Sequence, residues 1–199
     1  MSSEALVVID IQNDFCPGGA LAVEAGDTII PLVNRLIGRF EHVVLTQDWH
    51  PAGHSSFAST HSGKSPFETV AMPYGEQTLW PDHCIQGTDG AEFHAALEWT
   101  KAEIVIRKGF RPGIDSYSAF FENDHTTPTG LSGYLKERGI TKITLCGLAT
   151  DFCVAFSAID AVNSGFATEV VLDACRGIDL GGSIAAMTDT MKAAGVKLI

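Results

Sequence analysis

The sequence lacks the motifs that mark several common enzyme classes. It contains no G-x-S-x-G elbow, H-E-x-x-H pair, Walker loop or G-x-G-x-x-G turn, so serine hydrolases, zincins and nucleotide-binding folds lose their usual support. No apolar run approaches the roughly 18 residues that a membrane helix needs. No basic segment precedes an apolar stretch at the start of the chain, as one would in a signal peptide. We therefore expect a cytoplasmic protein without a membrane partner.

Basic residues and cysteines are also scarce. Lys and Arg total 13 against 24 Asp and Glu, which gives a formal net charge of −11. A surface of this charge repels phosphate backbones, so we expect no nucleic-acid partner. The five cysteines are odd in number and form no C-x-x-C pair, which argues against a disulfide framework. Nothing in the sequence decides between a monomer and a homo-oligomer.

Apolar runs alternate with amphipathic segments along the 199 residues. The runs predict six strands, at residues 5–10, 42–46, 103–107, 142–146, 168–173 and 196–199. Helical patterns cover residues 27–40, with Asp27 as the N-cap, and residues 130–138, 152–164 and 183–194. Continuous apolar strands separated by helices are typical of a parallel sheet covered on both faces. We therefore expect one domain over residues 1–199, with a three-layer α/β/α fold and a six-stranded parallel sheet.

Residues 47–90 break this alternation. They are rich in Gly, Pro, Ser and His, and they contain no pattern that predicts a strand. Loops longer than about 12–15 residues are usually functional or disordered. The aromatic content of this one argues against disorder. It also holds four of the seven histidines, so we treat it as a candidate metal-binding region.

Polar residues stand where four predicted strands end. Asp10 ends the first, Asp48 follows the second, Lys108 follows the third, and Cys153 lies a short turn beyond the fourth. In parallel sheets, ligands bind outside the carboxyl ends of the strands, so we expect these side chains to share one edge. A helix start and a nearby lysine lower a thiol pKa from about 8.5 toward neutrality. Asp10 could then take the thiol proton and return it to a leaving group, which makes Cys153 a candidate nucleophile.

The alternative for Cys153 is an inert thiol that packs as a small hydrophobe. Residues in the irregular region 47–90 also allow a functional and a non-functional interpretation. Asp48 and His50 are two positions apart, and His83 could complete a three-ligand metal site, with His54 as a fourth ligand. Carboxylate and imidazole donors suit Zn²⁺, Fe²⁺ or Mn²⁺. The alternative here is a set of solvated loop histidines.

Five segments taken in order resemble the nicotinamidase branch of the isochorismatase-like hydrolases, over about residues 6–173. They are VVIDIQNDFCPGGALAV, TQDWHPAGHSSF, LWPDHCIQGTDGAEF, IRKGF and GLATDFCV. The resemblance implies the fold described above. It also implies three groups of residues: the catalytic Asp10, Lys108 and Cys153; the metal ligands Asp48, His50 and His83, with His54 near an additional ligand position; and the aromatic substrate contacts Phe15, Trp80 and Tyr117.

The resemblance further implies an oxyanion hole made by the backbone N–H groups of Ala149 and Cys153, after a cis peptide bond between Leu148 and Ala149. It assigns no role to Phe152. The implied reaction converts nicotinamide to nicotinate and ammonia through a Cys153 thioester, in NAD salvage, with one divalent ion per chain and with pyrazinamide as a further substrate. The alternatives are a hydrolase of another small amide from the same superfamily and a non-enzymatic metal or thiol sensor.

Overall fold

The computed structural model describes residues 2–199 and contains the expected six-stranded parallel sheet. Met1, the first residue of the expected domain, lies outside the described residues. The strand order across the sheet is β5-β2-β1-β6-β7-β8. In chain order these strands are β1 (Glu4–Ile9), β2 (His42–Asp48), β5 (Ile104–Lys108), β6 (Lys142–Leu148), β7 (Ala167–Arg176) and β8 (Lys197–Leu198).

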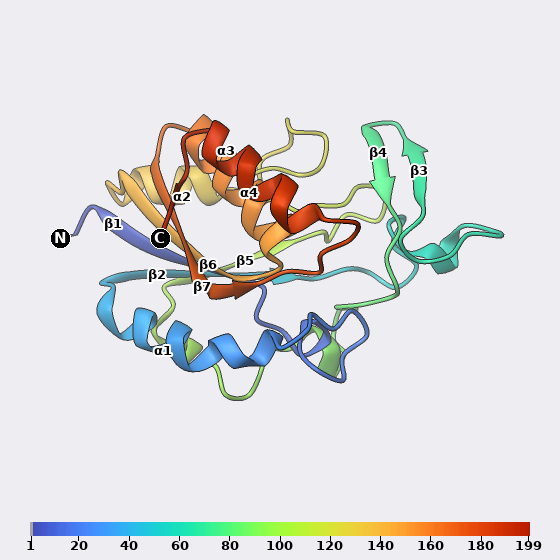
Figure 1. The fold of residues 1–199 in the computed structure, drawn as a ribbon, viewed down its shortest axis with the longest axis horizontal. Helices are drawn as coiled ribbons and strands as arrows, with labels where there is room; N and C mark the ends of the chain where they lie inside the picture. Colours follow the sequence, from blue (N-terminus) through green and yellow to red (C-terminus); the bar gives the residue numbers. More distant parts are fainter. Residues whose placement is uncertain (1) are drawn as a thin grey trace.

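Helices cover both faces of the sheet, which confirms the three-layer arrangement (Figure 1). Helix α1 (Ile30–Arg39) lies on one face, and α2 (Leu131–Glu137), α3 (Ala155–Asn163) and α4 (Ser183–Ala193) lie on the other. Strand β2 is buried along its whole length and β1 along all but its first residue. Such continuous burial explains why these strands read as unbroken apolar runs. Within residues 2–199, no helix has the length and apolar character to cross a membrane.

The strand register aligns the carboxyl ends of the central strands at one edge of the sheet. Asp48 of β2 pairs with Lys108 of β5, and Ile9 of β1 pairs with Gly147 of β6. Gly147 has φ +124°, and a Cβ there would lie 2.1 Å from the Ile9 carbonyl oxygen, so only glycine fits. The peptide bond between Leu148 and Ala149 is cis, as the family resemblance implies.

The irregular region contains a hairpin that the sequence analysis missed. Strands β3 (Thr69–Met72) and β4 (Gly75–Thr78) pair antiparallel and stand apart from the main sheet, beyond the carboxyl ends of its strands (Figure 1). The prediction of no strand here was wrong because no apolar side chain of the hairpin is fully buried. Within it, only Gln77 is buried, so the usual alternation of apolar and polar residues is absent.

Two predicted helix starts were also wrong. Asp27 is not an N-cap but lies inside a short 3-10 helix, Gly26–Ile29, that leads into α1. Ala25 adopts a left-handed conformation with φ 54° and starts this turn early. The helix expected from residue 152 begins instead as a π-helical turn, Thr150–Val154, which continues into α3.

Candidate active site

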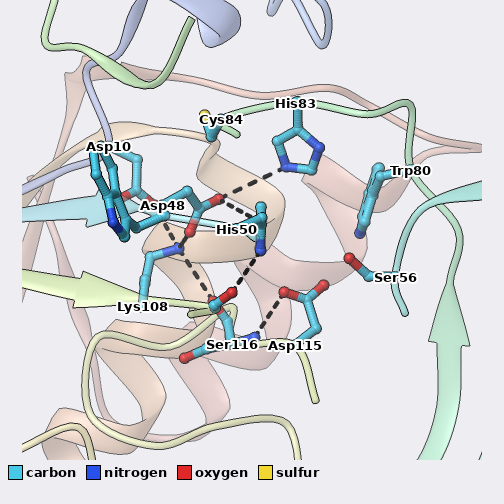
Figure 2. A network of polar contacts seen from close by, with 12 residues as sticks. Asp10, Asp48, His50, Ser56, Trp80, His83, Cys84, Lys108, Asp115 and Ser116 are labelled. Atoms are coloured by element: carbon cyan, nitrogen blue, oxygen red, sulfur yellow. Dashed lines mark hydrogen bonds and ion pairs between the residues drawn. The ribbon is translucent and has the colours of Figure 1, made fainter. Parts of the chain in front are cut away.

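Lys108 lies in a buried polar cluster at the carboxyl edge of the sheet (Figure 2). Its Nζ lies 2.8 Å from Asp10 Oδ2 and 3.4 Å from Cys153 Sγ. Nζ also forms an ion pair with Asp48 and donates to the Ser116 carbonyl oxygen at 3.2 Å. The structure thus brings together the four polar residues that follow predicted strands.

The two carboxylate oxygens of Asp10 face different partners. It follows β1 with φ 47°, and Oδ1 accepts a hydrogen bond from Thr46 Oγ1 at 2.6 Å. Oδ2 lies close to Lys108 but accepts no aligned hydrogen bond from residues 2–199. Carboxylate oxygens of Asp10 and Asp48 and the Cys153 sulfur all lie within 4.8 Å of one another. Asp10 therefore lies near the Cys153 thiol while its carboxylate is paired with the Lys108 ammonium.

The turn that carries Cys153 is anchored by a second buried carboxylate. Asp151 accepts hydrogen bonds from the backbone N–H groups of Ile178 at 3.0 Å and Asp179 at 2.9 Å. These bonds tie the π-helical turn to the loop that precedes α4. The backbone N–H groups of Ala149 and Cys153 belong to the same short segment after the cis bond, as the resemblance implies.

Burial and the ion pairs with Lys108 together shift the pKa values in this cluster. It raises the pKa of Asp10 to about 6, although the Lys108 ammonium opposes the shift. Burial also raises the pKa of Cys153 well above its usual value, again against Lys108. Burial alone would lower the pKa of Lys108, but the Asp10 and Asp48 carboxylates raise it well above its usual value. The sequence predicted a lowered thiol pKa, and that prediction was wrong because it took no account of burial.

Asp48 and two further side chains, His50 and His83, form a candidate metal centre (Figure 2). Asp48 Oδ2 lies 3.7 Å from His50 Nε2 and 3.9 Å from His83 Nε2. His50 Nδ1 contacts the Gly109 carbonyl oxygen at 2.9 Å, and His83 Nδ1 contacts the Pro81 carbonyl oxygen at 2.8 Å. A carbonyl only accepts, so each Nδ1 carries the hydrogen and each Nε2 keeps its lone pair toward Asp48. The donor set therefore fits a divalent ion such as Zn²⁺.

The two histidines differ in their tendency to take a proton. Burial, and then the neighbouring His50, lower the pKa of His83 to about 4, which keeps this imidazole neutral. Burial by itself would lower the pKa of His50, but the Asp48 carboxylate outweighs burial and raises it. A metal ion at this centre therefore competes with a proton at His50.

The structure does not bring His54 into this three-residue group. Its Nε2 contacts two carbonyl oxygens, those of Arg111 at 2.9 Å and Ile114 at 3.1 Å, so Nε2 carries the hydrogen. Its Nδ1 accepts from the backbone N–H of Ser56 at 3.2 Å. Both ring nitrogens are thus engaged, and the His54 ring lies 4.6 Å from the His50 ring. This geometry leaves His54 beside a candidate ligand, with no lone pair of its own free.

A cavity with aromatic walls adjoins both groups. Phe152 lies edge-on to Trp80, with 4.8 Å between ring centroids, and Trp80 is 6.1 Å from Tyr117. Phe15, Trp80 and Tyr117 all line the cavity, as does Phe152, to which the sequence assigned no role. The complete lining is Phe15, Leu21, Asp48, His50, Trp80, His83, Asp115, Tyr117, Ala149, Phe152, Cys153 and Ile178.

Sequence reasoning missed the lining residues Asp115, Leu21 and Ile178. Asp115 is 3% exposed, and a carboxylate oxygen of it lies within 4.8 Å of ring nitrogens of His50 and His54. Asp115 follows β5 by a few residues, so the strand-end rule could have found it. Leu21 and Ile178 carry no chemical signal in the sequence.

Comparisons with known proteins identify the family of this chain. The Isochorismatase domain model matches residues 4–199. A nicotinamidase of Acinetobacter baylyi is 55% identical over 195 residues, which cover 98% of this chain and 91% of that protein. The structure of an Acinetobacter baumanii nicotinamidase and pyrazinamidase superimposes with a TM-score of 0.99 at 60% identity, covering 100% of this chain and 96% of that one. A pyrazinamidase of Pyrococcus horikoshii in complex with zinc gives a TM-score of 0.81 at 36% identity, covering 100% and 99%.

Proposed function

This chain belongs to the isochorismatase family, and we propose that it is a nicotinamidase, which hydrolyses nicotinamide to nicotinate and ammonia. The observation that carries the proposal is the position of Lys108, whose Nζ contacts both Asp10 and Cys153 beside a cavity with aromatic walls. These three groups provide a base, a fixed positive charge and a nucleophile. The aromatic walls suit a flat heteroaromatic ring.

In the first half of the reaction, the Cys153 thiol gives its proton to Asp10 Oδ2 as sulfur attacks the carboxamide carbon. Because burial raises the pKa of the thiol, deprotonation is coupled to attack rather than completed beforehand. The C–N bond then breaks, and Asp10 returns the proton to the leaving nitrogen, which departs as ammonia. Lys108 holds the negative charge of the carboxylate and the sulfur in place throughout. The product of this half is a thioester on Cys153.

The tetrahedral intermediate carries a negative oxygen that needs hydrogen-bond donors. We assign this role to the backbone N–H groups of Ala149 and Cys153, which lie on one tight turn. Loss of one such donor costs about 10²–10³ in rate in other enzymes. The turn is fixed by the hydrogen bonds from Ile178 and Asp179 to Asp151, so the donors are preorganised.

In the second half, a water molecule attacks the thioester carbon while Asp10 Oδ2 takes one of its protons. The C–S bond breaks, and the proton on Asp10 returns to the Cys153 sulfur. The nicotinic acid that forms loses the second proton of the water to solvent and leaves as nicotinate. The same carboxylate therefore serves as base and acid in both halves, which its raised pKa of about 6 favours near neutral pH.

We assign Asp48, His50 and His83 as the ligands of one divalent ion, with zinc, iron and manganese all compatible with the donors. Support comes from the two free Nε2 lone pairs and from the zinc complex of the Pyrococcus horikoshii relative. A bound ion would supply a Lewis acid that orients substrate and polarises water. Asp48 also pairs with Lys108, so a single carboxylate joins the metal group to the catalytic group.

The substrate range includes pyrazinamide in this proposal, since its ring has the same size and its amide the same position. Ammonia release from nicotinamide, pyrazinamide and benzamide by the purified protein tests the assignment. We expect turnover of the first two and a large loss with benzamide, which has no ring nitrogen. Ammonia from benzamide alone would indicate another small-amide hydrolase. Release from no amide, with a thiol that oxidises readily, would indicate a sensor instead.

A further inference from the structure

Gln77 is the one buried residue of the β3–β4 hairpin, and it is 0% exposed. Its neighbour on β4, Glu76, is exposed. An uncharged amide is costly to bury unless its donors and acceptors are satisfied. The partners of Gln77 therefore indicate what the hairpin contributes to the site.

The nitrogen end of the Gln77 amide faces the cavity wall. Nε2 lies 3.0 Å from Asp115 Oδ2, 2.9 Å from the Tyr117 hydroxyl and 2.7 Å from the Thr78 carbonyl oxygen. A carboxylate and a carbonyl can only accept, so this end must be the NH₂ group. Asp115 and Tyr117 both line the cavity.

The oxygen end of the amide is fixed from the other side. Gln77 Oε1 accepts from Tyr74 Oη at 3.2 Å and from Asn123 Nδ2 at 3.1 Å. Asn123 is itself oriented, because its Oδ1 accepts from the Tyr117 backbone N–H at 2.9 Å. The partners at the nitrogen end and those at the oxygen end therefore assign the same orientation to the Gln77 amide group.

This arrangement determines the direction of the Tyr117 hydroxyl. Its oxygen receives Gln77 Nε2 at 2.9 Å and Trp80 Nε1 at 3.2 Å, and both of these nitrogens can only donate. The hydroxyl hydrogen has no acceptor among residues 2–199. The two Gln77 hydrogens are shared among three acceptors, but neither nitrogen beside the Tyr117 oxygen can accept, so the hydroxyl is left to offer its own O–H to a further partner.

We propose that Gln77 is a positioning residue for substrate binding: it orients Asp115 and makes the Tyr117 hydroxyl a donor to an acceptor atom of the bound heteroaromatic amide. This inference rests on the proposed function, because the ligand is the same substrate. It gives the hairpin a role beside the cavity, although none of its apolar side chains is fully buried. The hairpin carries one amide to the outer wall of the site.

The test compares Gln77→Met, which keeps length but loses both amide ends, with Glu76→Met on the exposed face of the same strand. We expect Gln77→Met to raise KM for nicotinamide about tenfold with kcat within about twofold, since a uniform binding contact is lost. Glu76→Met should leave both constants unchanged. The rate of Cys153 alkylation by iodoacetamide should also stay at the wild-type value, because Gln77 contacts neither Lys108 nor Asp10.

A double-variant comparison separates positioning from general stability. Tyr117→Phe should raise KM by a similar factor, and adding Gln77→Met to it should change KM little further, because both act through one hydrogen bond. Gln77→Glu, which changes one atom, replaces Gln77→Met if the latter melts far below the wild type. It should raise KM as well, since it sets a carboxylate oxygen against Asp115.

Two results would overturn the inference while leaving the proposed function intact. One is an active wild type with an unchanged KM in folded Gln77→Met or Gln77→Glu. The other is a double variant whose increase in KM equals the product of the increases seen in Gln77→Met and Tyr117→Phe alone. A wild type that releases no ammonia from nicotinamide would instead contradict the proposed function and this inference together.

Discussion

Lys108 Nζ and Cys153 Sγ lie 3.4 Å apart, although the two residues are 45 positions apart in the sequence. The contact arises because β5 and β6 both end at the same edge of the parallel sheet. It places an ammonium group that stays charged beside a thiol that burial keeps protonated. In the proposed reaction, the thiol therefore loses its proton to Asp10 as the sulfur attacks the substrate.

Lys108→Met tests the role of the ammonium group. The variant leaves the Asp10 and Asp48 carboxylates buried without their shared cation, and removing one partner of a buried ion pair costs about 3–5 kcal/mol. We expect a free energy of unfolding lower by that amount in urea titrations, together with loss of turnover. A Lys108→Met protein with full ammonia release would exclude Lys108 from the mechanism.

The pKa of Asp10, raised to about 6 by burial, predicts the acid side of the pH profile. Asp10 must be ionised to accept the thiol proton, so kcat/KM should fall as pH drops through about 6. The hydrogen bond from Thr46 stabilises the ionised form and lowers this pKa. Thr46→Val should therefore move the midpoint to higher pH. An unchanged midpoint in a folded, active Thr46→Val protein would assign the acid side to another group.

Metal content distinguishes ligands from neighbours. His50→Ala and His83→Ala should each lose the bound ion, while His54→Ala should retain one ion per chain, because both His54 ring nitrogens are already engaged. The His54 ring packs 4.6 Å from the ring of the proposed ligand His50, so His54→Ala should lose its ion to a competing chelator sooner than the wild type. Elemental analysis after dialysis measures both effects. Loss of the ion from His54→Ala without a chelator would make His54 a ligand.

Gly109 sets the position of His50. Its φ is +65°, and a Cβ would lie 2.3 Å from the His50 ring, so Gly109→Ala must displace the imidazole or its backbone partner. We expect Gly109→Ala to weaken metal binding about as much as a change in a ligand-orienting group does, about 10–100-fold. Gly113→Ala is the matched control, because a Cβ there meets nothing within 4 Å. Equal metal affinity in the two variants would show that His50 tolerates the added methyl group.

The fold and much of the candidate site were predictable because they follow from strand burial. Continuous apolar runs identified the six strands of the main sheet, and the strand-end rule singled out Asp10, Asp48, Lys108 and Cys153. The β3–β4 hairpin was not predictable in this way, since its one buried residue is the polar Gln77. The raised thiol pKa of Cys153 was missed for a related reason, because its degree of burial is a property of the folded chain.

Phe152 and His54 show a second limit of prediction from the sequence. The position of Phe152 against Trp80 depends on the π-helical turn, which no helical periodicity reveals. His54 has a residue type and spacing that suit a metal ligand. Two backbone carbonyls and Ser56 nevertheless occupy both of its ring nitrogens, and contacts between segments distant in sequence cannot be read from a local motif.

The role of Cys153 as the nucleophile is tested most directly by quenching the enzyme in acid during turnover of nicotinamide. The masses of the intact protein and of its peptides are then measured. If Cys153 forms the thioester, the peptide that contains it should gain the mass of one nicotinoyl group. The Cys153→Ala variant should show no adduct and should release no ammonia. That variant should melt near the wild-type temperature, since only a thiol is removed. Ammonia release by Cys153→Ala, or a nicotinoyl group on another residue, would contradict the assignment of Cys153 as the nucleophile.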